Sequence, residues 1–282
     1  MLGALYSAAT GMDAQQFNID TISNNLANVD TTGFKAVRPE FQDLFYQMLQ
    51  QPVAPSQGQG VPGSPTGVYV GLGVKPSGSE TLFQQGSLTD TGNPLDVAIS
   101  GDGFFTVSTD NGGTNKFYTR DGSFQLNANG DLVTSAGDYV LDGSGSPITL
   151  DNTEPITIAS DGTITNSSTT TSSSSGSSSG SSSGSVQLGI VTFPNESGLV
   201  REGDNLFAQS VASGDPQTSS TSSSSSTTPS YTVEQNYLES SNVQVVDEMV
   251  NLITAERAYE MNSKTITTCD DMLSMADNMK SS

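Results

Sequence analysis

Two apolar heptad patterns, one near each end of the 282-residue chain, constrain the fold more than any other feature. Near the N-terminus, one series of residues recurs every seven positions and a second follows it by three: Leu5, Met12, Ile19 and Leu26, then Ala8, Gln15, Ile22 and Val29. This is the spacing of the a and d positions of a coiled coil. It predicts a helix over residues 1–30, with Gly33 as a left-handed C-terminal cap.

The C-terminal segment has the same pattern. Its two interleaved series are Val245, Leu252, Tyr259, Ile266 and Leu273, then Ala255, Asn262, Cys269 and Ala276. We expect a helix within residues 241–282, with Asn242 as its N-cap. Asp247 and Glu248 then lie near the positive end of the helix dipole.

The matching seams predict that the two helices pair with each other, so the rest of the chain must leave and return at one place. Each helix could instead pack on the central region as an ordinary amphipathic helix, which is the simpler interpretation of one such helix. Two heptad helices in one chain favour a paired stalk. Polar seam residues, among them Gln15 and Asn262, weaken such a pair but specify its register. We therefore expect a pair that is marginal alone and that neighbouring subunits complete.

The middle of the chain reads as a connector followed by a β domain. Residues 51–66 are rich in Pro, Gly, Gln and Ser, which predicts an extended connector within residues 51–94. In residues 95–215, short alternating segments such as Val97 to Ile99 indicate strands. Between them stand dipeptides that favour the positive φ angles of tight hairpin turns: Asn111-Gly112, Asp121-Gly122, Asn129-Gly130, Asp142-Gly143 and Asp161-Gly162. The predicted class is α+β, with long N- and C-terminal helices pairing as a coiled coil and a central antiparallel β domain.

Two low-complexity segments interrupt this region. Residues 167–185 consist only of Ser, Thr and Gly, and residues 218–228 only of Ser and Thr. Such segments cannot bury a core, so we expect flexible loops or linkers. The first is an insert in the β domain, and the second lies in a linker and return segment, residues 216–240, before the C-terminal helix.

The charge excludes several kinds of partner. The chain has 9 Lys and Arg against 30 Asp and Glu, for a net charge of -21, and about two thirds of it lies in residues 51–240. Such a surface repels phosphate backbones and anionic lipid, so we expect no nucleic acid binding and no direct membrane insertion. No apolar run approaches the roughly 20 residues that span a bilayer. The N-terminus also lacks the basic and apolar regions of a cleavable signal.

The sequence offers no catalytic constellation. The absence of His excludes imidazole metal clusters and Ser-His-Asp triads. Cys269 therefore lacks its usual activating base and is expected to pack. Paired carboxylates stay open in principle, but most Asp residues precede Gly in turns, where they bond the local backbone. We predict no catalytic residues, no cofactor and no metal, and hence no enzyme.

Several segments resemble the signatures of the flagellar rod and hook axial proteins. They occur in the family's order over nearly the whole chain: Ile22-Ser23-Asn24-Asn25-Leu26-Ala27-Asn28-Val29, Thr32-Gly33-Phe34-Lys35, Gln85-Gly86-Ser87-Leu88, Leu95-Asp96-Val97-Ala98-Ile99, Gly103-Phe104-Phe105, Tyr118-Thr119-Arg120-Asp121-Gly122-Ser123-Phe124 and Arg257-Ala258-Tyr259-Glu260-Met261-Asn262-Ser263-Lys264. The stretches Phe41-Gln42-Asp43-Leu44, Gln51-Pro52 and Gly71-Leu72-Gly73-Val74 resemble the distal-rod branch of this family. The Ser/Thr-rich segments depart from its pattern.

The resemblance implies a helical homopolymer in the flagellar basal body, a hollow shaft across the periplasm that transmits torque and channels exported subunits. It implies export by the flagellar type III apparatus without a cleaved signal. The implied partners are neighbouring rod and hook proteins, that apparatus, and the periplasmic and outer-membrane rings. We expect the subunits to interact through the helix seams: Leu5, Met12, Ile19, Ile22, Leu26, Val29, Val245, Leu252, Tyr259, Ile266 and Leu273. The alternatives are a hook or proximal rod subunit, or a secreted binding or adhesion module.

Overall fold

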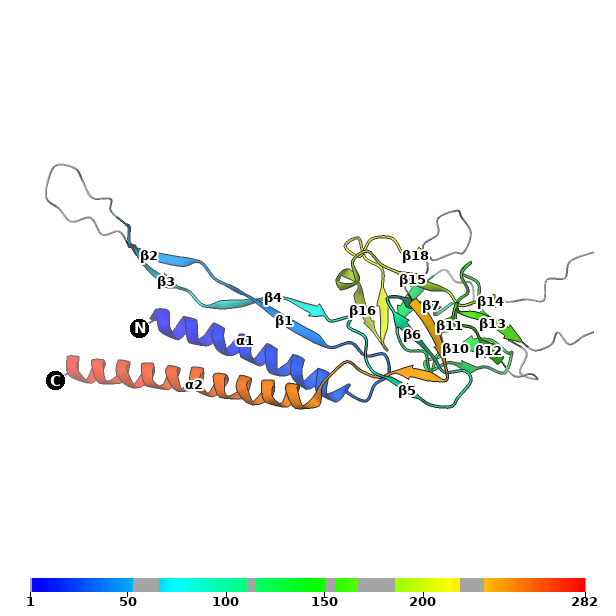
Figure 1. The fold of residues 1–282 in the computed structure, drawn as a ribbon. Helices are drawn as coiled ribbons and strands as arrows, with labels where there is room; N and C mark the ends of the chain where they lie inside the picture. The colour runs from blue at the N-terminus through cyan, green and yellow to red at the C-terminus, as the bar shows by residue number, and fades with distance from the viewer. Residues whose placement is uncertain are drawn as a thin grey trace, which may run out of the picture. The chain divides into compact units, whose positions relative to one another are not determined.

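The computed structural model describes residues 2–52, 66–110, 115–150, 156–166, 186–218 and 231–281. The predictions for most of the Pro/Gly-rich connector, for the Asn111-Gly112 turn and for nearly all of both low-complexity segments lie outside these residues. The helices are α1 (Leu2–Ala27), η1 (Glu196–Gly198) and α2 (Val245–Ser281), shown with the strands in Figure 1. Together with the antiparallel strands between α1 and α2, they fit the predicted α+β class.

The chain forms two compact units. The helix unit comprises Met1–Ala27, Val37–Thr81 and Gln244–Ser282, and the β unit comprises Asn28–Ala36 and Leu82–Val243. The chain therefore passes between the units four times.

Helix α1 ends at Ala27, short of the predicted residue 30. The backbone N–H of Thr31 donates to the carbonyl of Asn28, which turns the chain out of the helix. Gly33 does have the left-handed φ of +67°. Its N–H donates instead to the carbonyl of Glu239 at 2.8 Å, so the prediction of a helix cap at Gly33 was wrong.

Helix α2 begins at Val245, and the N–H of Glu248 donates to the carbonyl of Gln244. Asn242 is thus not the N-cap that the sequence predicted. Its side chain accepts a hydrogen bond from the N–H of Ala36 and donates to the carbonyls of two residues in another segment, Leu82 and Gln84. The side chain of Asn242 therefore forms hydrogen bonds with backbone far away in the sequence, and not with the N-terminus of α2. The acidic first turn, with Asp247 and Glu248, is confirmed.

Within the helix unit, α1 and α2 lie side by side and run antiparallel (Figure 1). Asn25 Nδ2 lies 3.4 Å from Glu248 Oε1, and a Cβ on Gly11 would lie 2.9 Å from Asn262 Nδ2. These contacts set a register in which α2, with 37 residues against 26, continues past the start of α1.

Two antiparallel ladders complete the helix unit. One pairs β1 (Val37–Asp43) with β4 (Val74–Thr81), and the other pairs β2 (Tyr46–Gln50) with β3 (Val68–Gly71). The side chain of Asn25 bonds both the N–H and the carbonyl of Val37, at 2.9 and 2.8 Å, which fixes the start of β1 against α1. The sequence predicted an extended connector over residues 51–94 and did not predict these ladders.

The β unit is built around β7 (Phe104–Ser108), which lies in a sheet of nine described strands. On one side β7 pairs with β8 (Lys116–Thr119); on the other, β15 (Ile190–Thr192) covers its first half and β11 (Tyr139–Val140) its second. The sheet continues through β9 (Gln125–Leu126), β10 (Leu132–Val133), β16 (Val200–Gly203), β17 (Leu206–Ala208) and β18 (Gln217–Thr218).

Smaller sheets flank this one. Two of them pair β5 (Leu88–Asp90) with β20 (Tyr237–Glu239) and β6 (Val97–Gly101) with β19 (Tyr231–Gln235). In the third, β13 (Thr163–Asn166) lies between β12 (Ile156–Ile158) and β14 (Val186–Gln187). Every described strand pair is antiparallel, as the sequence predicted for the central region.

Both faces of β7 are buried, because alternate side chains enter different cores. Phe105 and Val107 join a larger, mostly aliphatic core. Phe104 joins an aromatic core with Tyr118, Phe193 and Phe207, its ring centroid 5.9 Å from those of Phe193 and Phe207.

Three of the predicted Gly turns have two different causes, whereas Gly143 shows neither, because its φ is not positive and a Cβ there would meet nothing within 4 Å. Gly130 and Gly162 have positive φ angles of +87° and +80°, as expected for tight turns. Gly122 does not; a Cβ there would collide with the carbonyl of Val97. The glycine at this position allows two backbones to approach closely.

Candidate subunit-interaction surfaces

Most of the fully buried apolar residues of α1 and α2 are small. The buried residues of α1 include Ala8, Ala14 and Ile22, and those of α2 are Ala255 and Cys269. Short side chains let helix backbones approach, as the contact of Gly11 with Asn262 requires. The pair therefore buries little apolar surface per residue, so hydrophobic stabilisation within a single chain is limited.

The predicted seam residues fall into four groups. Ile22 is buried, and six others are partly buried: Leu5, Met12, Ile19, Leu26, Leu252 and Ile266. Val245, Tyr259 and Leu273 are exposed. Val29 lies outside α1, where it packs against Phe34, Ala36 and Val243 of the β unit. Its assignment to the helix seam was wrong, because the helix ends before it.

A stripe of apolar side chains lies exposed on the first turns of α2. It consists of Val246, Met249, Val250 and Ile253, and Val246 is 73% exposed. Their spacing places them on one side of a helix. We call this set the α2 stripe. A second exposed group, Met272, Met275 and Met279, lies in the part of α2 that continues past α1.

The β2–β3 ladder is also exposed over its whole length. Every residue of both strands is exposed, including Tyr46, Met48, Tyr69 and Val70. Phe45, which directly precedes β2, is 89% exposed. Contiguous apolar surface of this kind marks protein interaction sites. The sequence signal was the clustering of Tyr, Met and Val around the connector, which the Pro- and Gly-rich composition of residues 51–66 obscured.

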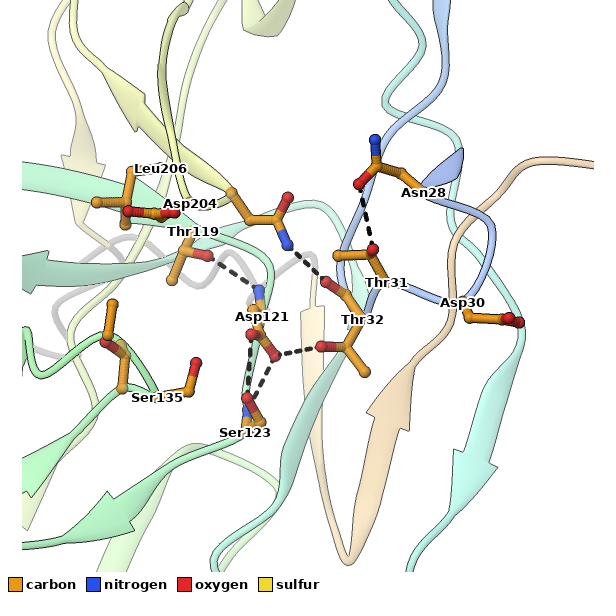
Figure 2. A pocket seen from close by; sticks show the side chains of 13 residues that line it. Asn28, Asp30, Thr31, Thr32, Thr119, Asp121, Ser123, Ser135, Asp204 and Leu206 are labelled. Carbon is orange, nitrogen blue, oxygen red and sulfur yellow. Dashed lines mark hydrogen bonds between the residues drawn. The ribbon is translucent and has the colours of Figure 1, made fainter. Parts of the chain in front are cut away.

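The β unit holds a polar cavity of about 640 Å³, shown in Figure 2. Segments 28–32, 119–123, 134–136 and 204–206 contribute its lining. The carboxylate of Asp121 accepts hydrogen bonds from the hydroxyl of Thr32 at 2.9 Å and from the N–H and hydroxyl of Ser123 (Figure 2). Asn205 Nδ2 donates to the carbonyl of Thr32 at 3.0 Å. These groups hold the segment after α1 onto the β unit.

The chemistry of this cavity does not indicate catalysis. Its lining has no basic side chain and no thiol, and the described residues contain no group of His, Cys, Asp and Glu suited to a metal ion. The turn aspartates bond the local backbone as predicted. Asp161, for example, accepts from the N–H of Thr163 at 3.0 Å, and this hydrogen bond lowers the pKa of its carboxyl. None of the described helices is long and apolar enough to cross a membrane.

Comparison with known families gives three matches in chain order. Residues 5–35 match the family described as "Flagella basal body rod protein", and residues 98–166 match "Flagellar hook protein FlgE/F/G D1 domain". Residues 234–279 match "Flagellar basal body rod FlgEFG protein C-terminal".

Relatives match over almost the full chain. The flagellar basal-body rod protein FlgG of Agrobacterium fabrum is 45% identical over 96% of this chain and 97% of its own length. The protein of the same name from Buchnera aphidicola subsp. Baizongia pistaciae is 42% identical over 97% and 98%, and that of Bacillus subtilis is 36% identical over 99% and 100%.

Proposed function

Because the chain belongs to the family of flagellar basal-body rod proteins, and is thus a structural rod subunit and not an enzyme, we propose how it assembles. The family assignment places it in the flagellar basal body, where it assembles with other rod and hook proteins. In our proposal it forms a helical homopolymer through its terminal helices, at the distal end of the rod.

The observation that carries this proposal is the pairing of two terminal helices that leave apolar side chains exposed. The α2 stripe and the methionines near the end of α2 lie in water in the single chain. Burying one such side chain contributes roughly 1.5–3 kcal/mol. A contact that repeats from copy to copy without closing produces a helical filament.

In this proposal the helices pair as a coiled coil, and the predicted seams serve both the pair and the contacts between copies. The exposed residues Val245, Tyr259 and Leu273 supply contacts to neighbouring copies. The proposed domains are residues 1–50 as the N-terminal helix with the start of the connector, residues 95–215 as the central β domain, and residues 241–282 as the C-terminal helix. The subunits leave the cytoplasm through the flagellar export apparatus without a cleaved signal. The hollow shaft that they form then spans the periplasm and passes through the surrounding rings.

A hook subunit is the second candidate. The match of residues 98–166 to a family segment described for hook as well as rod proteins favours it. The near full-length similarity to proteins named for the basal-body rod favours the rod.

The test is a deletion strain, complemented with variants, with electron microscopy of isolated basal bodies. A rod that stops short supports the distal position, whereas a complete rod without a hook supports the hook candidate. Complementation with Val246→Gln, Val250→Gln and Ile253→Gln together should fail to extend the rod, although the subunit is made and exported.

The matched control is Val211→Gln, which alters a fully exposed valine in a turn of the β unit. This variant should restore motility. If the triple variant restores motility to the same level, the proposed role of the α2 stripe in subunit contacts is wrong.

A further inference from the structure

Three charged side chains are buried together in the β unit. Lys35, Arg120 and Glu239 are each no more than 2% exposed. Lys35 Nζ lies 2.6 Å from Glu239 Oε1, and Arg120 Nη1 lies 3.6 Å from Glu239 Oε2. Burying charges is costly unless they are paired, so these three groups depend on one another.

The balance of charge within this cluster is uneven. In the part of the chain that the structure describes, the ion pairs of Lys35 and Arg120 are both made with Glu239. The half-buried Glu196 is a more distant carboxylate; burial raises the pKa of its carboxyl, and the charges of Arg120 and Lys35 oppose that rise. Glu239 is therefore the direct counter-charge of two buried cations.

The members of the cluster come from distant parts of the chain. Lys35 lies in segment 28–36, directly before the chain enters the helix unit at Val37. Glu239 lies in the segment that precedes the return to the helix unit at Gln244. Arg120 lies between these two segments in the sequence. Its guanidinium donates to the carbonyl of Gly101 at 2.9 Å and lies 5.1 Å from the ring centroid of Phe104.

Backbone contacts join the same two segments. The N–H of Gly33 donates to the carbonyl of Glu239, and the N–H of Ala36 donates to Asn242 Oδ1, both at 2.8 Å. Glu239 Oε1 also accepts from the N–H of Gly86 at 2.8 Å. Few apolar residues of segment 28–36 are buried: Phe34 and Ala36 pack with Val243, which follows Glu239 in segment 237–243.

We propose that Lys35, Arg120 and Glu239 form a latch that makes the docking of segment 28–36 and the ordering of segment 237–243 conditional on each other. Without the return segment, Lys35 and Arg120 would be buried without their counter-charge. Without segment 28–36, Glu239 would lose its closest partner. Each segment also has contacts that do not involve the other, such as Thr32 with Asp121 and β20 with β5. The buried charges are balanced only when both segments are in place, so the docking of each segment favours the docking of the other.

The latch does not rest on the proposed polymer, because every contact in it lies within the β unit of one chain. It is tested on the full-length protein in dilute solution by amide hydrogen exchange. The rates to compare are those of residues 33–36, of residues 237–240, and of β7 as the internal reference for the core.

Glu239→Gln keeps the shape of the side chain and removes its charge. We expect it to speed exchange in residues 33–36 by roughly 100-fold or more, because removing one partner of a buried pair leaves the others uncompensated. Lys35→Met should speed exchange in residues 237–240 by a smaller factor, because Glu239 keeps Arg120. Rates in β7 should be unchanged in Lys35→Met. The control is Glu80→Gln, which breaks the exposed Arg38–Glu80 pair of 2.7 Å and should change none of these rates.

The decisive comparison is whether a change in one segment speeds amide exchange in the other segment, in both directions, since a coupling free energy between two segments is reciprocal. If Lys35→Met speeds exchange only in its own segment, or if folded Glu239→Gln exchanges like the wild type in residues 33–36, the latch is refuted. If Glu239→Gln does not fold, the milder Lys35→Met still decides, because its effect on residues 237–240 is measured in a folded protein.

Discussion

Replacing Gly33 with alanine tests how tightly segment 28–36 fits the β unit. Gly33 has a φ of +67°, and a Cβ there would lie 2.6 Å from the backbone N of Asp121 and 2.8 Å from the backbone C of Arg120. Gly92 provides the matched control: its φ is +70°, but a Cβ there meets nothing within 4 Å.

The two substitutions share one cost and differ in the other. A left-handed conformation costs a residue with a Cβ about 1–2 kcal/mol, and both alanines incur it. Only Gly33→Ala also forces a methyl group against backbone atoms, which cannot rotate away as a side chain can. Overpacking of this kind costs about 1–3 kcal/mol. We therefore expect Gly33→Ala to lower the free energy of unfolding by about 2–5 kcal/mol and Gly92→Ala by about 1–2 kcal/mol.

The assay is urea unfolding of the full-length protein, monitored by the far-ultraviolet circular dichroism signal of its β structure. The informative quantity is the difference between the two variants, because the strain common to both cancels. If the two free energies agree within about 0.5 kcal/mol, the inferred contact between Gly33 and the 120–121 backbone does not limit stability, and the reasoning from backbone proximity is wrong.

Three further predictions concern other parts of the fold. Phe104→Ala, in the aromatic core, should lower the free energy of unfolding by about 3–5 kcal/mol in urea titrations, whereas Phe45→Ala, at an exposed site, should change it by less than about 0.5 kcal/mol. Burial raises the pKa of Glu196, so the folded chain keeps a proton that the unfolded chain releases. The contribution of this proton to the free energy of unfolding is complete below the ordinary carboxyl pKa of about 4.5. It is lost as the pH rises through the raised pKa of the folded chain. Urea titrations from pH 4 to 7 should show this fall for the wild type and a flatter profile for Glu196→Gln. Asn25→Ala removes both hydrogen bonds to Val37 and should speed amide exchange at Val37, while an unchanged rate would show that β1 is held by other contacts.

Regular patterns allowed the helices and the central sheet to be predicted. The heptads indicated α1 and α2, and the apolar residues Val97 and Ile99 indicated β6, where both side chains join the larger core of the β unit. The helix ends were less predictable. The predicted cap Gly33 lies beyond the end of α1, where the carbonyl of Asn28 accepts from the N–H of Thr31. The predicted N-cap Asn242 bonds a distant backbone instead.

Long-range polar contacts left no local signal at all. Lys35 and Glu239 stand 204 positions apart, and nothing around either residue distinguishes it from a solvated charge. The β1–β4 ladder was also missed, because strand β1 is mostly exposed and so lacks the alternation of a half-buried strand. Sequence patterns report burial, and both features depend on something other than a buried apolar face.

The four passages of the chain between the helix unit and the β unit have a mechanical consequence. Two bodies joined by one linker can rotate freely about it, because the φ and ψ bonds of a linker rotate with little resistance. Bodies joined by four chain segments cannot make a full rotation, since the segments would wind around one another and shorten. A twist applied to either unit is therefore passed to the other through covalent bonds, with the load divided among four segments of the same chain.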